Sequence, residues 1–181
     1  MKANLFPKEW IDSTYQIDFE RLYREGARGL IFDIDNTLVP HGAPADERAV
    51  KLFGSLHKLG FQTLLLSNNG DKRVKPFAEA VSSSYLCKAG KPKKAGYVAA
   101  MEKMQTSNED TIFVGDQIFT DVWGANRAQI YTILVRKIHP KEEIQIVLKR
   151  ALEFFIMAAF LLYKKVRREP VAVHSVSASD S

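Results

Sequence analysis

The chain has 181 residues, 46% of them hydrophobic, and a formal net charge of +5. This length favours one domain with a buried core. The charge favours anionic partners but does not choose among phosphate esters, nucleic acid and acidic lipid surfaces. The single cysteine, Cys87, excludes an internal disulfide, and with four histidines the chain offers no zinc site of the cysteine and histidine type. The N-terminal run MKANLFPKEW lacks a long apolar stretch, so we expect no signal peptide and a cytoplasmic location.

Strand-like and helix-like segments alternate along the chain. Short apolar runs typical of strands buried on both faces occupy residues 29–35, 62–68, 111–116 and 131–136, with a short edge strand at 85–87. Apolar residues at helical spacing predict helices over 44–59, 71–81, 92–105 and 120–129. This alternation predicts an α/β fold with a central parallel sheet covered by helices on both faces.

Proline and glycine mark the expected helix ends. Pro44 and Pro92 are placed for first-turn positions, and Gly60 for the end of the first long helix. Pro76 must lie in a first turn or kink its helix.

Polar side chains gather where the predicted strands end, which is where an open α/β sheet binds its ligands. These residues are Asp33, Asp35, Ser67, Asn68, Asp116 and Asp121, with Lys91 at the start of the third helix. Each of these features taken alone is more often a solvated turn or a helix start. Their occurrence in order, at successive strand ends, favours a functional site instead.

The first pair of aspartates points to a metal ion. Asp33 and Asp35 are separated by one residue, and their carboxylates repel each other unless a cation or a proton is shared. Magnesium prefers oxygen ligands, and Asp33, Asp116 and a backbone carbonyl near Asp35 are suitable protein ligands. Such an ion would also screen an attacking carboxylate from an anionic phosphate ester. We therefore expect a Mg²⁺ cofactor.

The same aspartates suit a two-step phosphate transfer. We expect Asp33 to attack phosphorus and form an aspartyl phosphate. Asp35 would protonate the leaving alkoxide and later deprotonate the hydrolytic water. These assignments predict a phosphomonoester hydrolase.

Several neutral or cationic groups are expected to bind the phosphoryl group. The backbone N–H groups of Asn36 and Thr37 lie in a turn that suits phosphate oxygens, and Ser67 with Asn68 offers side-chain donors. Lys91 would supply a fixed positive charge. We choose Lys91 because it directly precedes a proline, but three nearby lysines compete for the role: Lys88, Lys93 and Lys94.

These motifs resemble those of the haloacid dehalogenase (HAD) superfamily of phosphohydrolases, and their residues are similar to those of the YqeG-like group of subfamily IIIA. The matching residues are Asp33-Ile-Asp35-Asn-Thr37, Ser67, Lys91-Pro92 and Gly115-Asp116-Gln-Ile-Phe-Thr-Asp121. The resemblance, which runs from about residue 5 to 136, implies a three-layer α/β/α Rossmann-like fold.

The resemblance also implies roles for individual residues. Asp33 would be the nucleophile and a metal ligand, and Asp35 the acid and base, counted among the metal-binding residues through the backbone carbonyl named above. Ser67 and Lys91 would bind phosphate, and Asp116 the metal. Asp121 would support either the metal or Lys91.

Members of this superfamily often insert a cap domain after the first or the second motif. Here residues 36–66 and 68–90 leave room only for a loop, a helix and a strand each. We therefore expect a capless protein with an open site. An open site cannot enclose a small metabolite, so it suits a phosphate carried by a lipid surface, a protein or a nucleic-acid end.

The C-terminal part is expected to be separate from a core that covers residues 1–140. Residues 154–163 are uninterrupted apolar residues flanked by lysines and arginines, within a helix that we expect over 141–169. Ten residues of helix are about 15 Å long, roughly half a bilayer core. This helix would lie in an anionic membrane interface, pack on the core or join an oligomer. Residues 170–181 are expected to be disordered.

Three functions stay open at this stage. The YqeG-like group is similar to phosphatidylglycerophosphate phosphatase, which implies a lipid head-group phosphate as substrate and a peripheral place on the inner face of the membrane. The second is a cytosolic phosphatase of protein or nucleic-acid phosphomonoesters. No interleaving of aromatic and basic residues marks a base-stacking surface, so we expect no specific nucleic-acid partner. The third is a scaffold protein that kept the fold.

Overall fold

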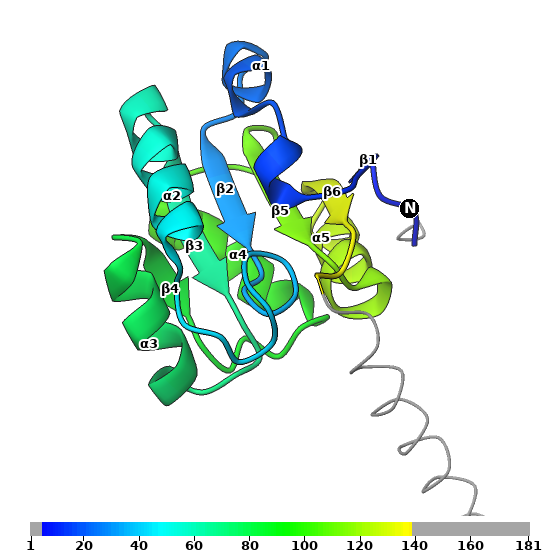
Figure 1. Cartoon of the computed structure of the whole chain (residues 1–181). Helices are drawn as coiled ribbons and strands as arrows, with labels where there is room; N and C mark the ends of the chain where they lie inside the picture. The colour runs from blue at the N-terminus through cyan, green and yellow to red at the C-terminus, as the bar shows by residue number, and fades with distance from the viewer. Residues whose placement is uncertain (1–4, 139–181) are drawn as a thin grey trace, which may run out of the picture. The chain divides into compact units, whose positions relative to one another are not determined.

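Six parallel strands form the central sheet of the computed structural model, in the order β1-β6-β5-β2-β3-β4 (Figure 1). The chain divides into two units, Met1–His139 and Pro140–Ser181, and the structure describes residues 5–138. The strands are β1 (Glu9–Ile11), β2 (Gly29–Phe32), β3 (Gln62–Leu66), β4 (Ser84–Leu86), β5 (Thr111–Gly115) and β6 (Tyr131–Val135). The helices are α1 (Phe19–Arg24), α2 (Glu47–Leu59), α3 (Asp71–Ala80), α4 (Lys94–Met104) and α5 (Trp123–Arg127), with a 3₁₀ turn η1 (Thr14–Gln16) and a π-helical turn η2 (Ile118–Val122).

The strands are apolar throughout because helices cover both of their faces. Along β2, Leu30 and Phe32 belong to a core cluster that includes residues of α1, α2 and α3, whereas Ile31 belongs to a second cluster with residues of α4 and α5. All three side chains are fully buried. The predicted three-layer α/β/α architecture with a parallel central sheet is therefore confirmed.

The predicted strands are confirmed, including the edge strand β4, but the helix starts are not where the prolines suggested. Helix α2 begins at Glu47 because Asp46 caps it, its Oδ1 accepting from the N–H of Ala49 at 2.7 Å. Helix α4 begins at Lys94, after Pro92, and the Lys91–Pro92 peptide is cis. A proline thus precedes each helix instead of opening it.

The other two helix predictions have different outcomes. Gly60 ends α2 with φ +100°, a left-handed conformation that glycine adopts readily. Pro76 lies in the interior of α3 and not in its first turn. The helix predicted over 120–129 is replaced by η2 followed by the short α5.

Two elements near the N-terminus were not predicted. Strand β1 has three residues and pairs with β6, and its central Trp10 is 69% exposed. Helix α1 has six residues, capped by Asp18. Both are too short to show a periodic apolar pattern, so only their neighbours in space reveal them.

The connections that lead to the sheet edge contain no inserted domain. Between β2 and β3 lie a loop and α2, and between β3 and β4 lies α3. The part of the chain that the structure describes is therefore capless, as predicted. No helix within residues 5–138 is long and apolar enough to cross a membrane. The helix expected over 141–169 and the tail 170–181 lie outside the described residues.

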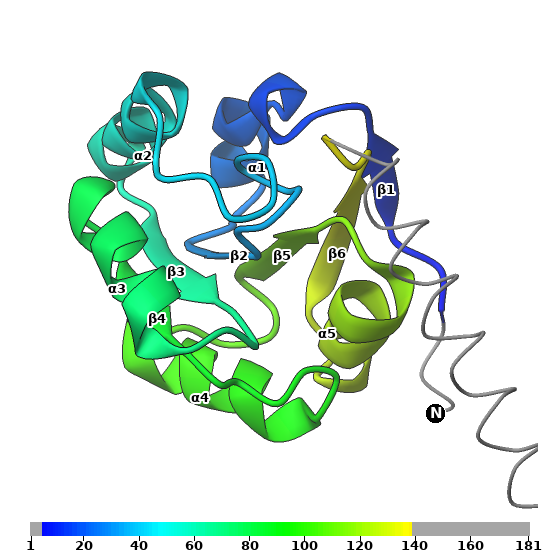
Figure 2. The same cartoon turned by 60° about the horizontal axis from the view of Figure 1, so that its bottom comes forward.

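The chain order reverses between β2 and β5, which are neighbours in the sheet. From β2 the chain proceeds outward to β3 and β4, and later returns to β5 and β6 on the other side. Figure 2 looks toward the carboxyl ends of these strands, where the following loops come together. Such a reversal point is where open α/β sheets bind their ligands, and here Asp33 and Asp116 flank it.

Candidate active site

A buried lysine joins two aspartates at the carboxyl end of the sheet. The Nζ of Lys91 donates to Asp33 Oδ1 at 2.5 Å and to Asp121 Oδ1 at 2.7 Å. All three residues are less than a tenth exposed. Asp33 follows β2, while Lys91 arrives from the loop before α4 and Asp121 from η2. Three segments far apart in sequence thus meet in one charged cluster.

The π-helical turn holds Asp121 in this cluster. Its Oδ2 accepts from the N–H of Gln117 at 3.0 Å, which closes the turn on itself. A β-carbon at Gly115 would lie 2.5 Å from that same oxygen, so only glycine leaves room for the carboxylate at the end of β5. Single π turns are frequent at functional sites. Here the position of the Asp121 carboxylate in such a turn explains why residue 115 is a glycine.

Asp116 lies in the same cluster as Asp33 and Asp121 but is bound by other residues. Its Oδ1 accepts from Thr37 Oγ1 at 3.0 Å, and Lys137 Nζ lies 3.7 Å from Oδ2. Oδ2 is buried and accepts no hydrogen bond from the described residues. A buried carboxylate oxygen without a hydrogen bond is costly unless another positive group binds it.

The carboxylates fit a divalent cation. Asp33, Asp116 and Asp121 each offer an oxygen, and these atoms lie within 4.8 Å of one another. Oxygen donors of this kind suit Mg²⁺, and the buried Asp116 Oδ2 accepts no hydrogen bond from the described residues, its ion-pair partner Lys137 Nζ lying at 3.7 Å. The Asp35 carboxylate does not belong to this cluster, and the metal contact expected from a backbone carbonyl near Asp35 stays a prediction.

The buried carboxylates of this cluster have raised pKa values. Burial raises the pKa of Asp33 to about 6, while Lys91 opposes this shift and Asp121 adds to it. It also raises the pKa of Asp116 to about 7, with Asp121 and then Asp33 adding to the effect. For Lys91, burial acts to lower the pKa, but the two aspartates beside it raise it overall. Lys91 and the more exposed Lys137 are two positive charges beside three buried carboxylates, and a bound cation would supply the charge that is missing.

Asp35 is bound by a different set of hydrogen-bond donors. Its Oδ1 accepts from the N–H of Gly42 and from Arg73 Nη2, both at 2.8 Å, and its Oδ2 accepts from Asn69 Nδ2 at 2.7 Å. His41 lies 4.0 Å from Oδ1. The carboxylate is thereby fixed in orientation close to Asp33 but outside the Lys91 cluster.

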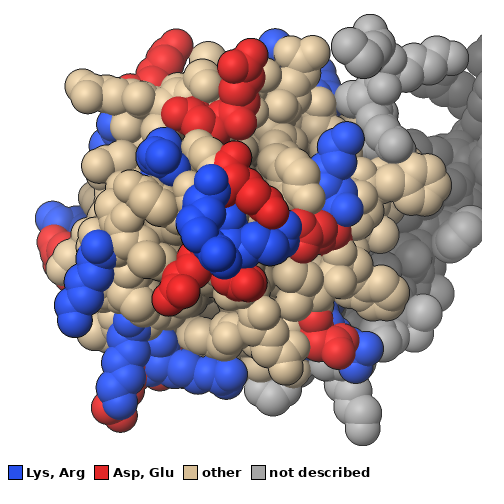
Figure 3. All heavy atoms as spheres, turned by 90° about the horizontal axis from the view of Figure 1, so that it is seen from above, with Lys and Arg blue, Asp and Glu red and all other residues tan. Residues whose placement is uncertain are grey.

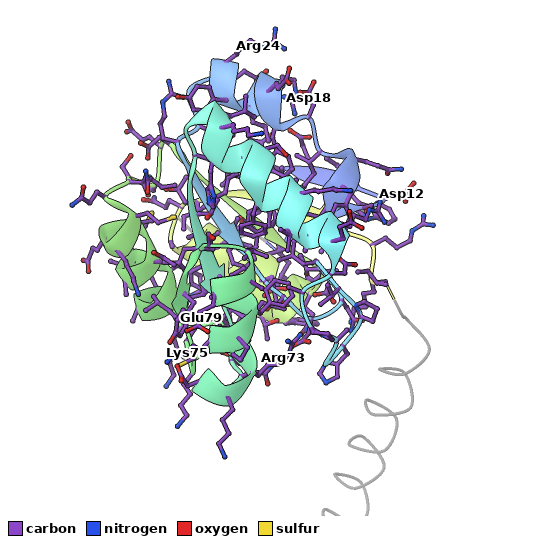
Figure 4. All side chains as sticks on the ribbon, turned by 60° about the vertical axis from the view of Figure 1, so that its left-hand side comes forward. Asp12, Asp18, Arg24, Arg73, Lys75 and Glu79 are labelled. Carbon is purple, nitrogen blue, oxygen red and sulfur yellow. The ribbon has the colours of Figure 1, made fainter. Side chains whose placement is uncertain are left out.

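Asn69 and Arg73 were not identified from the sequence. Asn69 had a signal, since it continues the Ser67-Asn68 turn after β3. Arg73 had none, because a basic residue in a helix beside other charged residues is usually solvated. Figure 4 shows it on the side of α3 opposite Lys75 and Glu79. Only the fold brings it to Asp35.

Asn68 contacts the backbone of Lys91, and its expected contact with phosphate stays a prediction. Its Nδ2 donates to the carbonyl of Lys91 at 3.2 Å, and its Oδ1 accepts from the N–H of Lys91 at 2.7 Å. Both polar atoms of the amide thus contact the backbone of Lys91, and Nδ2 has a second hydrogen besides the one donated there. Ser67 is buried, and its Oγ accepts from the N–H of Asn69 at 3.1 Å, which leaves the hydroxyl hydrogen for a phosphate oxygen.

The expected phosphate donors in the turn after Asp35 are also engaged. The N–H of Asn36 donates to the carbonyl of Val39 at 2.8 Å, and that of Thr37 to the carbonyl of Ile34 at 3.3 Å. Asn36 has φ +64°, which bends the chain back so that these bonds close the turn. The Thr37 side chain instead binds Asp116. Both residues therefore shape the site, in place of the predicted backbone contacts to phosphate.

The choice among the four lysines follows from burial. Lys91 is enclosed between two aspartates, whereas its three competitors are exposed: Lys88, Lys93 and Lys94. Only Lys91 therefore lies where a buried phosphoryl group would be bound.

Comparisons with known proteins agree with this geometry. Residues 42–129 match the sequence model of the haloacid dehalogenase-like hydrolases. The chain is 35% identical over 136 residues to "Probable phosphatase YqeG" of Bacillus subtilis (strain 168), covering 75% of this chain and 79% of that protein. It is 31% identical over 171 residues to "Phosphatidylglycerophosphate phosphatase 1, chloroplastic/mitochondrial" of Arabidopsis thaliana, covering 87% of this chain and 48% of that protein, about half of its length.

Solved structures share the fold at low sequence identity. An uncharacterized protein from Listeria monocytogenes serotype 4b superposes with a TM-score of 0.51 at 18% identity, covering 68% of this chain and 99% of its own. A hypothetical protein from Xanthomonas campestris superposes with a TM-score of 0.52 at 13% identity, covering 75% of this chain and 79% of its own. Both likenesses concern the fold alone.

A parallel α/β/α sheet with buried carboxylates at its reversal point, together with these relatives, defines a hydrolase of phosphoric monoesters. The chain belongs to the haloacid dehalogenase-like hydrolases, and within them it is YqeG-like.

Proposed function

We propose that this phosphatase is Mg²⁺-dependent, works through an aspartyl phosphate on Asp33, and converts phosphatidylglycerophosphate to phosphatidylglycerol. The observation that carries the mechanism is the buried cluster of Asp33, Lys91 and Asp121 beside Asp116. It combines a nucleophile, a fixed cation and a set of oxygen ligands within one small volume.

In the first step a carboxylate oxygen of Asp33 forms a bond to phosphorus while the bond between phosphorus and the ester oxygen breaks. Lys91 is fixed by its two aspartates and by Asn68, so its ammonium offsets negative charge on the phosphoryl oxygens without reorganising. The hydroxyl of Ser67 donates to another of those oxygens. This part of the site binds and orients the phosphoryl group.

Asp35 transfers the protons. It gives a proton to the leaving alkoxide, and in the second step it takes one from water as the hydroxide attacks phosphorus. That attack releases inorganic phosphate and restores the Asp33 carboxylate. Asn69 and Arg73 hold Asp35 in the orientation that both transfers need.

The metal would be held by Asp33, Asp116 and Asp121. A bound Mg²⁺ supplies positive charge that offsets repulsion between Asp33 and an anionic phosphate ester.

The lipid substrate is supported by two observations. The described residues carry no cap that would enclose a small metabolite. A relative that matches most of this chain is named as a phosphatidylglycerophosphate phosphatase. We place the protein in the cytoplasm, peripherally on the inner face of the membrane, with a lipid head group as partner and no specific nucleic acid.

The test is a substrate panel with the full-length protein and Mg²⁺. Phosphate release is measured from phosphatidylglycerophosphate in mixed micelles, from phosphopeptides and from oligonucleotides phosphorylated at the 3′ or 5′ end. We expect the lipid to be hydrolysed fastest, and Asp33→Asn to lower this rate by a factor on the order of 10⁴ or more while the fold stays intact. Activity confined to peptides or oligonucleotides would replace the lipid by those substrates. An active Asp33→Asn variant would contradict the nucleophile assignment.

A further inference from the structure

Two exposed apolar side chains lie directly beside the catalytic cluster. Ile118 is 45% exposed and Phe119 is 68% exposed. Both belong to η2, between Asp116 and Asp121, which have buried carboxylates. An aromatic ring exposed to this extent next to a charged site needs an explanation, because nothing in the charged cluster requires it.

These side chains are presented by a well-fixed turn. The carbonyl of Gln117 accepts from the N–H groups of Asp121 at 3.0 Å and of Val122 at 3.1 Å. The hydroxyl of Tyr97 donates to the carbonyl of Thr120. The backbone is thus bound on both sides of Ile118 and Phe119, so their exposure is a property of the folded turn.

Exposed lysines come from the neighbouring loops at the same edge of the sheet. The loop before α4 is adjacent to η2 and α5, because Lys91 binds Asp121 and Arg127 Nη1 lies 3.5 Å from the carbonyl of Pro92. The exposed lysines of this loop, of the start of α4 and of the first turn of α3 are Lys72, Lys88, Lys93 and Lys94. Within residues 5–138 these four form no ion pair with an acidic side chain.

The acidic groups at this edge do not cancel that charge. The carboxylates of the site are buried, Glu47 forms an ion pair with Lys51 at 2.5 Å, and Asp71 accepts from the hydroxyl of Tyr85 at 2.8 Å. The face at the amino ends of the strands differs, because acidic and basic side chains are interspersed on it (Figure 3). The catalytic edge thus carries exposed lysines without acidic partners among the described residues, together with the exposed side chains of Ile118 and Phe119.

We propose that this catalytic edge docks on an anionic lipid bilayer, with Ile118 and Phe119 entering the boundary between head groups and acyl chains and the four lysines contacting lipid phosphates. Apolar side chains flanked by basic ones bind such interfaces through both effects together. The proposal rests on the proposed function, since it presents a lipid phosphate to Asp33 while the lipid stays in its bilayer. The lipid phosphate then does not have to leave the bilayer and cross water to reach Asp33.

The test uses full-length protein and sedimentation with vesicles of phosphatidylcholine alone or of an equimolar mixture with phosphatidylglycerol. We expect the double variant Ile118→Ser, Phe119→Ser to bind the mixed vesicles at least about tenfold more weakly, because it has less apolar area to bury in the membrane interface. The matched control is Trp10→Ser, which removes an aromatic side chain of the same exposure from β1. That control should bind as the unmodified protein does.

The lysines are tested separately. Replacing Lys88, Lys93 and Lys94 by Gln should weaken binding to the mixed vesicles by about fivefold for each lysine, and the loss should shrink as salt is added. Binding to phosphatidylcholine alone should change little. Equal losses on both kinds of vesicle would overturn the electrostatic part of the proposal.

Activity separates docking from catalysis. The apolar variant should hydrolyse a small soluble phosphomonoester as fast as the unmodified protein, and lose activity on phosphatidylglycerophosphate in vesicles. Unchanged vesicle binding of that variant, or no binding by the unmodified protein, would overturn the proposal. If binding falls as expected but no lipid phosphate is hydrolysed at all, docking holds and the substrate assignment fails.

Discussion

Asp33 and Asp35 are separated by one residue, yet the fold places them in two different environments. Asp33 is paired with Lys91 and lies close to two further carboxylates, which we call the inner environment. Asp35 accepts from Gly42, Asn69 and Arg73, which we call the outer environment. Both carboxylates are buried, so the two environments differ in their partners and not in their exposure. Under the proposed mechanism the first suits a nucleophile, because fixed positive charge lies beside it, and the second suits a proton donor whose orientation is fixed.

The two aspartates of the Asp33-Ile34-Asp35 motif are therefore bound by two separate groups of residues. The inner group comes from the loops that follow β4 and β5, and the outer group from those that follow β2 and β3 and from α3. Substitutions in each group should therefore have distinct signatures.

The largest effect is expected when the inner environment is broken at Lys91. Lys91→Met leaves Asp33 and Asp121 buried without their partner, which should lower the free energy of unfolding by about 3 to 5 kcal/mol and abolish activity. Urea unfolding without Mg²⁺ measures the first effect. Lys93→Met is the matched control, and because Lys93 is exposed it should stay within about 0.5 kcal/mol of the unmodified protein. Equal stability of the two variants would contradict the buried ion pair.

A smaller effect is expected when the outer environment is broken at Arg73. Arg73→Ala removes one donor from Asp35 and should lower kcat roughly tenfold, part of the contribution of a general acid, with little change in KM. The loss should be greater for an alkyl phosphate than for p-nitrophenyl phosphate, whose leaving group needs no proton. Arg73→Lys should restore part of the rate.

The control for Arg73 lies on the same helix. Lys75 pairs with Glu79 on the other side of α3, so Lys75→Ala should leave kcat unchanged for both substrates. A loss at Arg73→Ala that is equal for both leaving groups would mean that Arg73 acts on the fold in general and not through Asp35.

The smallest effect concerns the pH dependence of metal binding. The raised pKa values of Asp33, about 6, and Asp116, about 7, mean that the metal-free site takes up protons as the pH falls through this window. Ionising these groups in the metal-free fold costs stability, so their contribution to folding is present at acidic pH and lost as the pH rises through 6 and 7. Mg²⁺ competes with these protons.

Mg²⁺ should therefore bind with proton release, and its affinity should rise by up to about tenfold per pH unit below this window for each proton released and level off above it. Calorimetry in buffers of different ionisation enthalpy measures the released protons. The increase in Tm on adding Mg²⁺ should also be greater at about pH 8 than at about pH 5. An increase of the same size at both would contradict the assignment of these aspartates as ligands.

The sequence allowed much of this arrangement to be anticipated. Five of the six strands and the positions of Asp33 and Asp116 follow from apolar runs that end in polar residues. Lys91 was chosen because it precedes a proline, and the role of Asp121 came from the family resemblance. The backbone contacts with phosphate predicted for Asn36 and Thr37 do not match the structure, because their N–H groups close a turn. The contacts of Asn68 with the backbone of Lys91 were not predicted. Whether such a group faces a ligand or its own loop depends on local backbone geometry, which composition does not specify.

By itself the sequence determined which residues stand at the strand ends, because strands covered by helices on both faces require uninterrupted apolar runs, and these stop where the strand ends. The tertiary structure alone decided which environment each aspartate occupies. Arg73 reaches Asp35 across 38 residues of chain and Lys91 reaches Asp33 across 58. Contacts over such separations depend on how the helices pack on the sheet, and no local pattern encodes that packing.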